Sequence, residues 1–158
     1  MSPRVLLGLG SNLGDRDANL VAALDRLEEE NALCVVAMST VRTSAPVGGP
    51  RQPDFRNAAA LADTHLPPQK LLAAMQRAEE ALGRRRDGVR WGPREVDVDL
   101  LLYGDEILDE PGLVVPHPRM AARRFVLEPA AEIAPEMRHP VLRRTLLELL
   151  HELRETPA

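Results

Sequence analysis

The apolar residues of the chain follow two spacings, and each spacing predicts a different kind of element. Short apolar runs, bounded by glycine, proline or charged residues, predict four strands: 5–9, 34–42, 57–62 and 96–103. Apolar residues three and four positions apart predict a helix in each of the two long gaps between these strands. The first helix follows an N-capping Asp15, and the second opens at Pro67-Pro68 and stops at Gly83.

The C-terminal third predicts smaller elements. A hairpin-like piece over 107–115 leads into Pro116-His117-Pro118, and helices are predicted over 120–128 and 143–154. The order strand, helix, strand, strand, helix, strand, followed by these additions, predicts a ferredoxin-like α/β sandwich. This is an α+β fold with a mostly antiparallel sheet and helices on its faces. We expect residues 1–158 to form a single domain.

Composition narrows the class of protein. The 158 residues carry 24 acidic and 20 basic side chains, and the resulting net charge of −4 argues against a general nucleic-acid coat protein. No apolar run is long enough to span a membrane, and the N-terminal residues lack a signal-peptide pattern. The single cysteine, Cys34, allows no internal disulfide. We therefore expect a cytoplasmic protein that binds neither nucleic acid nor membranes.

Two aspartates in the last of the four strands are the sharpest local feature. Asp97 and Asp99 are two residues apart, so a strand places both carboxylates on one face. The other face takes the apolar neighbours Val96, Val98 and Leu100. Two carboxylates aimed the same way suit Mg²⁺, which typically also binds substrate phosphates. The same alternation is equally typical of an edge strand with a solvated acidic face.

An arginine-rich segment directly precedes this strand. Five arginines fall close together in an otherwise acidic chain: Arg84, Arg85, Arg86, Arg90 and Arg94. One guanidinium group can bind two phosphate oxygens at once. Arginines followed by two carboxylates are therefore typical of a site that binds a nucleotide together with its metal ions. An isolated run of this kind also fits a solvated basic loop. The adjoining aspartates favour phosphoryl transfer.

Two further segments carry weaker signals. Gly8, Gly10 and Gly14 stand between a strand and a helix, but their spacing is only a loose match to a dinucleotide-binding turn. Phe55 and Asn57 share one face of a strand, where a ring and a two-sided amide suit a planar heterocycle. A phenylalanine at the start of a strand is also an ordinary core residue.

Four segments together resemble the 6-hydroxymethyl-7,8-dihydropterin pyrophosphokinase family, over nearly the whole chain. They are Gly10-Ser11-Asn12-Leu13-Gly14, Gln52-Pro53-Asp54-Phe55-Arg56-Asn57-Ala58-Ala59, Arg90-Trp91-Gly92-Pro93-Arg94-Glu95-Val96-Asp97-Val98-Asp99-Leu100 and Val115-Pro116-His117-Pro118-Arg119-Met120. The third segment is the most specific. The resemblance implies transfer of the β,γ-diphosphate of ATP to the pterin hydroxymethyl group, with release of AMP, in folate biosynthesis.

The resemblance also implies roles for individual residues. Asp97 and Asp99 would ligate two Mg²⁺ ions and, with Arg84 and Arg94, form the catalytic group. The ATP contacts would be Gln76, Glu79, Arg84, Arg86, Trp91, Arg94, Leu100, Leu113, His117 and Arg123. The pterin contacts would be Ser44, Pro46, Val47, Phe55, Asn57, Trp91, Asp97 and Phe125. The pterin would stack between the two phenylalanine rings. The partners would be ATP and 6-hydroxymethyl-7,8-dihydropterin, and the chain would be a monomer.

Two other functions are also considered. One is a different metal-dependent nucleotidyl or phosphoryl transferase that uses the same pair of aspartates. The other is a non-catalytic ferredoxin-like module that binds a ligand or RNA. RNA binding needs exposed aromatic residues and a basic sheet face. The chain has four aromatic residues and a net charge of −4, which supply neither.

Overall fold

A computed structural model describes residues 2–46, 49, 51–83 and 95–155. Five strands form the main sheet: β1 (Arg4–Ser11), β2 (Cys34–Met38), β3 (Arg42–Ser44), β4 (Phe55–Asp63) and β5 (Asp97–Tyr103). The strand order is β2-β4-β1-β5, with β3 also paired to β4, and every pair is antiparallel. Strand β1 therefore lies between β4 and β5. This confirms the predicted ferredoxin-like arrangement.

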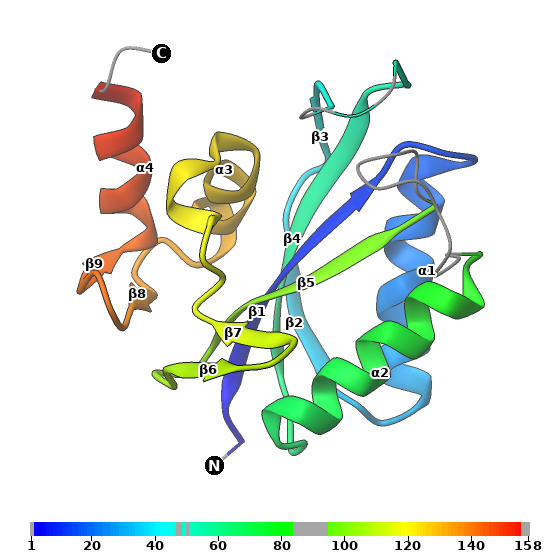
Figure 1. Cartoon of the computed structure of the whole chain (residues 1–158), viewed down its shortest axis with the longest axis horizontal. Coiled ribbons are helices and arrows are strands. Elements are labelled where there is room, and N and C mark those ends of the chain that lie inside the picture. Colours follow the sequence, from blue (N-terminus) through cyan, green and yellow to red (C-terminus); the bar gives the residue numbers. More distant parts are fainter. Residues whose placement is uncertain (1, 47–48, 50, 84–94, 156–158) are drawn as a thin grey trace.

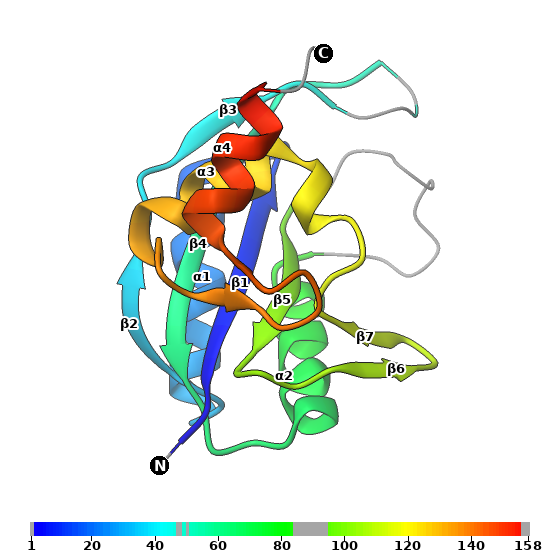
Figure 2. The same ribbon diagram turned by 90° about the vertical axis from the view of Figure 1, so that its left-hand side faces the viewer.

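Helices cover both faces of the sheet, as Figures 1 and 2 show. One face carries α1 (Arg16–Glu29) and α2 (Pro68–Ala81), and the other carries α3 (Arg124–Ile133) and α4 (Leu146–Glu155). The two-residue period of β1 divides its side chains between two cores. Val5, Leu7 and Leu9 belong to the core beneath α1 and α2, whereas Leu6 belongs to the core beneath α3 and α4.

The edge strand β5 also supplies both cores, and its register against β1 shifts once. Val98 and Leu100 pack into the α1/α2 core, as predicted from the sequence. Leu101 and Leu102 both pack into the α3/α4 core, and Tyr103 returns to the α1/α2 core. An extra residue in one strand of a pair interrupts the strict alternation of faces in this way.

The first two helices confirm the predicted start signals. The Asp15 carboxylate accepts a hydrogen bond from the backbone N–H of Ala18, 3.2 Å away, which caps α1. Helix α2 begins at Pro68 and is followed by Gly83, whose φ of +108° is readily adopted only by glycine. Among the described residues, no helix is long and apolar enough to cross a membrane.

Several predicted bounds are wrong. The stretch 34–42 is two strands separated at 39–41. The helix predicted over 120–128 is a 3-10 turn, η1 (Met120–Ala122), followed by α3, because Arg123 is extended between them. The helix predicted from 143 begins later, because two short strands come first: β8 (Arg138–His139) and β9 (Arg144–Thr145).

The hairpin-like piece predicted over 107–115 is confirmed. It consists of the paired strands β6 (Leu108–Glu110) and β7 (Leu113–Val115). Gly112, in the turn between them, has a φ of +77°. That left-handed conformation is one that glycine adopts without steric cost.

Candidate active site

The sheet face beneath α3 and α4 becomes polar toward one end. Cross-strand pairing places Arg42, Asn57, Gly10 and Asp97 in one row across β3, β4, β1 and β5. Directly paired residues of antiparallel strands point to the same face of a sheet. The amide of Asn57 and the carboxylate of Asp97 therefore stand on one face, with Gly10 between them.

The neighbouring row repeats this arrangement. Gly8 pairs with Ala59 on one side and with Asp99 on the other. A Cβ atom at Gly10 would lie 3.2 Å from Asn57 Oδ1 and 3.6 Å from a ring carbon of Phe55. The two glycines therefore form a strip without side chains, which separates the two aspartates from the residues of β4.

The two aspartates occupy the start of β5. Asp99 is exposed and Asp97 is half-buried. Between them, the backbone N–H of Val98 donates to the carboxylate of Glu79 on α2, over 2.9 Å. Glu79 is only 6% exposed, so a buried group holds the strand from the α1/α2 side. Its predicted contact with ATP stays a prediction.

The number of carboxylate ligands near Asp97 and Asp99 indicates which metal ion the pair could bind. Within the described ranges, no three or more His, Cys, Asp or Glu side chains form a group that could hold a metal ion. Two carboxylates on one face are too few for a closed protein site. They fit Mg²⁺, which is usually bound through one or two carboxylates together with substrate phosphates and water.

On the other side of the glycine strip, β3 and β4 bring together three predicted pterin contacts. Asn57 is buried, and its Nδ2 donates to the hydroxyl of Ser44 over 2.6 Å. Ser44 pairs with Phe55 in the strand register, and Phe55 shares the face of Asn57. Pro46, two residues beyond Ser44, is half-buried. The structure therefore groups a ring, an amide and a hydroxyl at one end of the sheet.

Phe125 approaches the same face from α3. It lies in the first turn of that helix and is half-buried, and α3 packs against β3 and β4. The guanidinium carbon of Arg123 lies 5.5 Å from the centroid of the Phe125 ring, within cation–π range. Phe55 lies on β4 and Phe125 lies on α3. The two phenylalanines predicted to stack on the pterin thus belong to adjacent layers, because α3 packs against the sheet (Figure 1).

His117 joins the site beside β5. Its backbone N–H donates to the carbonyl of Leu101 over 2.9 Å, and its Nδ1 accepts from the N–H of Arg119. Burial lowers the pKa of the imidazole, and the positive charges of Arg123 and Arg119 also lower it, while the carboxylate of Asp99 raises it. His117 is therefore a mostly neutral group that lies close to an aspartate and two arginines.

The remaining predicted contacts are spread over the fold. Gln76 is exposed on α2, while Leu100 and Leu113 are buried in the α1/α2 core. The predicted contacts of these residues with ATP stay predictions. Five predicted site residues lie outside the described residues: Val47, Arg84, Arg86, Trp91 and Arg94.

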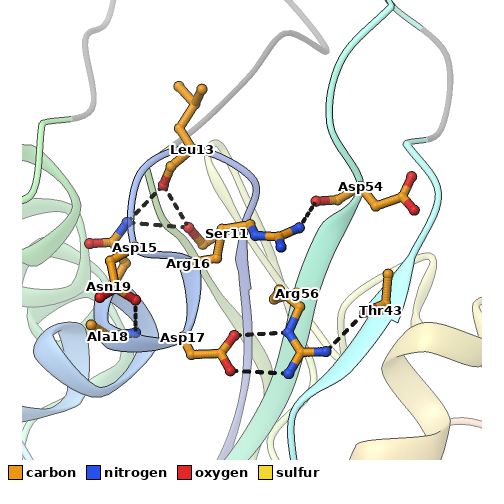
Figure 3. A network of polar contacts seen from close by, with 10 residues as sticks. All are labelled: Ser11, Leu13, Asp15, Arg16, Asp17, Ala18, Asn19, Thr43, Asp54 and Arg56. Carbon is orange, nitrogen blue, oxygen red and sulfur yellow. Dashed lines mark hydrogen bonds and ion pairs between the residues drawn. The ribbon is translucent and has the colours of Figure 1, made fainter.

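Sequence reasoning missed the polar groups that hold the site end of the sheet together (Figure 3). The Asn19 side-chain amide donates to the carbonyls of Leu13 and Glu95, over 3.0 and 3.1 Å. Asn19 and Glu95 are 76 residues apart, so no local pattern could have revealed this contact. It ties α1 to the backbone two residues before Asp97.

A second set of these contacts joins α1 to β4. Both oxygens of Asp17 accept from the guanidinium of Arg56, at 2.8 and 3.0 Å, and Arg56 also donates to the hydroxyl of Thr43 (Figure 3). Arg16 donates to the carbonyl of Asp54, over 3.0 Å. These contacts hold the backbone on both sides of Phe55, at Asp54 and at Arg56.

The fold and the site together define a ferredoxin-like α+β protein with a carboxylate pair and an aromatic–amide group on one sheet face. The chain belongs to the 7,8-dihydro-6-hydroxymethylpterin-pyrophosphokinase (HPPK) family, whose profile matches residues 6–135. It is therefore an enzyme of the diphosphotransferase class.

Relatives with the name 2-amino-4-hydroxy-6-hydroxymethyldihydropteridine pyrophosphokinase match most of the chain. The protein from Pseudomonas aeruginosa is 47% identical over 140 residues, which cover 89% of this chain and 86% of that protein. The protein from Aquifex aeolicus is 42% identical over 148 residues, which cover 94% and 91%.

A solved structure of Plasmodium falciparum HPPK-DHPS A437G/K540E, with pterin and p-hydroxybenzoate, has a similar fold. The TM-score is 0.75 at 13% identity, and the match covers 96% of this chain. This chain spans only 43% of the length of that protein. At so low an identity the likeness concerns the fold alone.

Proposed function

We propose that this chain transfers the β,γ-diphosphate of ATP to the hydroxymethyl oxygen of 6-hydroxymethyl-7,8-dihydropterin, a reaction of folate biosynthesis. The hydroxymethyl oxygen forms a bond to the β-phosphorus and loses its proton. The bond between that phosphorus and the oxygen bridging to the α-phosphate breaks, and AMP leaves. One observation carries the proposal: the glycine strip separates an aromatic–amide group from a pair of carboxylates on a single face.

Residues of β3, β4 and α3 would bind the pterin. Asn57 combines donor and acceptor capacity, which suits the ring nitrogens and the amino group of a pterin. Its Nδ2 already donates to Ser44, and this bond orients the amide before substrate arrives. Phe55 and Phe125 supply flat apolar surfaces from two layers, for stacking on the two faces of the pterin.

The phosphate side falls to β5 and the residues near it. Asp97 and Asp99 would hold two Mg²⁺ ions, which when bound supply positive charge to the phosphate oxygens. Glu79 holds the backbone of β5 at Val98, and Asn19 holds the backbone just before β5 at Glu95, so the two contacts position both carboxylates. Arg123 and Asp99 both act electrostatically on His117, so Arg123 adds a permanent positive charge on the side of the site where the transferring phosphates would lie.

The finer assignments belong to the same proposal. Arg84, Arg86, Trp91 and Arg94 complete the nucleotide site, and Arg84 and Arg94 act on the charge of the transferring group. We assign the chain to one domain, because both cores share the same sheet. We also assign it to the cytoplasm as a monomer, in keeping with its one free cysteine and net charge of −4.

The test is a product assay with purified protein, ATP, Mg²⁺ and 6-hydroxymethyl-7,8-dihydropterin. We expect AMP and the pterin diphosphate in equal amounts, and no turnover when Mg²⁺ is removed with a chelator. Formation of ADP or of free pyrophosphate would contradict the proposal and would favour a different phosphoryl or nucleotidyl transferase.

A further inference from the structure

The two sides of the proposed pterin site come from different layers of the fold. Ser44, Phe55 and Asn57 lie on the sheet, and Phe125 lies on α3. The apolar side of α3 is fixed by packing, because its Leu127 is fully buried in the α3/α4 core. The side of α3 that faces β3 is instead bound to the sheet by polar groups. We call the four residues involved the α3 bridge: Thr40, Arg42, Glu128 and Glu132.

The centre of the α3 bridge is the Glu132 carboxylate. One of its oxygens accepts from the Thr40 hydroxyl at 2.7 Å and from Nη2 of Arg42 at 2.8 Å. The other oxygen accepts from the backbone N–H of Thr40 at 2.8 Å. Three donors on one carboxylate form a set of charge-assisted hydrogen bonds, which are about twice as strong as neutral ones. The Thr40 and Arg42 contacts also lower the pKa of Glu132, so the group is ionised at neutral pH.

Each end of the α3 bridge lies next to a proposed pterin contact: Phe125 on the helix and Asn57 on the sheet. On α3, Phe125, Glu128 and Glu132 are three and four residues apart, so they lie along one side of the helix. On the sheet, Arg42 pairs with Asn57 in the strand register. Arg42 Nε lies 3.9 Å from the Glu128 carboxylate, one helical turn from Phe125.

The anchor of the α3 bridge on the sheet, Thr40, follows a residue that is hydrogen-bonded to β4. Ser39, next to Thr40, exchanges backbone and side-chain hydrogen bonds with Ala59: its N–H donates to the Ala59 carbonyl, and its hydroxyl accepts from the Ala59 N–H, both at 2.9 Å. Ser39 is 6% exposed. The interruption between β2 and β3, which the sequence did not predict, thus holds Thr40 in place for Glu132.

The stability of the fold does not by itself explain why position 42 is an arginine. Its Nη1 is buried and has no hydrogen-bond partner among the described residues. An unpaired buried donor is costly, and an ion pair whose two side chains are 36% and 30% exposed adds little to the stability of a fold. The contribution of Arg42 is therefore better sought in the position of α3 than in the stability of the fold.

We propose that the α3 bridge is a positioning device for pterin binding: it sets the separation between Phe125 and the Phe55–Asn57 group of the sheet. This inference rests on the proposed function of the chain. Neither Arg42 nor Glu132 is assigned a contact with substrate. Their effect passes through Phe125, whose ring must lie at stacking distance from the pterin to contribute.

The test compares Arg42→Met with Arg124→Met. Both variants remove one arginine that pairs with Glu128, but Arg124 is 55% exposed and makes no contact with Glu132 among those that define the α3 bridge. We expect Arg42→Met to raise the KM for the pterin about five- to tenfold, with the KM for ATP and the thermal midpoint nearly unchanged. Arg124→Met should behave like the parent protein, and Arg42→Lys should recover part of the pterin affinity.

A double-mutant cycle with Glu132→Gln completes the experiment. The effects of Arg42→Met and Glu132→Gln on the pterin KM should be less than additive, because both changes break the same contact. An unchanged pterin KM, an equal rise in both KM values, or loss of the fold in Arg42→Met and Arg42→Lys would overturn the positioning role. Failure of the proposed function is recognised separately, because the parent protein would then form no AMP.

Discussion

Asp97 and Asp99 are the residues whose chemistry is most specific to the proposed reaction. We expect Asp97→Asn and Asp99→Asn each to lower kcat at least about 100-fold, because each removes a charged ligand from the phosphate side of the site. Thermal midpoints should stay the same or rise slightly, because two carboxylates on one strand face repel each other when no metal ion is bound. Steady-state kinetics and thermal unfolding would measure both effects.

Asp109→Asn provides the matched control for these variants. Asp109 is an exposed aspartate on β6, in the separate β6–β7 hairpin. This variant should keep the activity of the parent protein. Near-parental activity in either Asp97→Asn or Asp99→Asn would contradict the assignment of the pair as metal ligands.

Gly10 matters because of the side chain it lacks. A methyl group there would approach Asn57 Oδ1 to 3.2 Å, so the amide or the Phe55 ring would have to shift. We expect Gly10→Ala to raise the pterin KM several-fold, measured by steady-state kinetics. The protein should gain little stability, because crowding offsets the usual advantage of alanine over glycine in a strand, about 0.5–1 kcal/mol.

Gly8→Ala is the comparison for Gly10→Ala. A methyl group at Gly8 would lie 3.4 Å from a terminal carbon of Leu101, which is an ordinary packing contact. This variant should therefore gain stability in a denaturant titration and affect the pterin KM less than Gly10→Ala does. Equal effects of the two substitutions on the pterin KM would contradict the crowding of Asn57 as the cause.

At the scale of elements, strand β8 ends at a buried histidine, His139, beside the β8–β9 turn. His139 Nδ1 accepts hydrogen bonds from the backbone N–H groups of Val141 and Leu142, so the ring is neutral there. Burial lowers the pKa of His139 below its ordinary value of 6.5. As the pH falls, the unfolded chain takes up this proton first. The contribution to stability is therefore complete above about pH 6.5 and is lost toward the lowered pKa of the folded state.

We expect this titration to appear as a difference between two proteins. His139→Asn keeps an acceptor at the turn but does not titrate in this range. Between about pH 7.5 and pH 5.5, the parent protein should lose more free energy of unfolding than His139→Asn does, as measured by denaturant titrations at each pH. Equal losses in the two proteins would show that His139 is not the group responsible.

Elements were predictable where their signals are local. Asp15 caps the helix that follows it, and Pro67-Pro68 opens the next one, because capping and proline geometry involve only near neighbours. The bounds failed where distant contacts decide them. The backbone leaves β2 at Ser39 because Ser39 and Thr40 bind Ala59 and Glu132, and nothing near them in the sequence signals either partner.

At the scale of the molecule, the two hydrophobic cores pack against opposite faces of one sheet. Leu20 in the α1/α2 core and Leu127 in the α3/α4 core are both fully buried. We expect Leu20→Ala and Leu127→Ala each to lower the free energy of unfolding by about 2–5 kcal/mol. Both should keep a single unfolding transition, because loss of either core exposes the shared sheet.

Circular dichroism and amide hydrogen exchange would test this cooperativity with independent probes. If the Leu127→Ala variant unfolded in two steps, with α3 and α4 lost first, the assignment of the chain to one domain would be wrong. Val21→Ala on α1 is a suitable control, because this valine is 48% exposed and its truncation should cost little.

The sequence by itself determined the features that depend on near neighbours. The two-residue period of a strand places Asp97 and Asp99 on one face whatever the rest of the chain does. The order of periodic segments was enough to predict the ferredoxin-like class, and the specific motifs were enough to predict the family. These features can be predicted because the period of a helix or strand and the spacing of a motif depend only on residues that are close together in the sequence.

Only the tertiary structure decided which of these local features meet. The register of β1 between β4 and β5 places Gly10 between Asn57 and Asp97. Thr40 contacts Glu132 across 92 residues of sequence, as part of the bridge proposed to position α3. Register and helix placement follow from the burial of two apolar cores at once, a condition on the whole chain that no single segment contains.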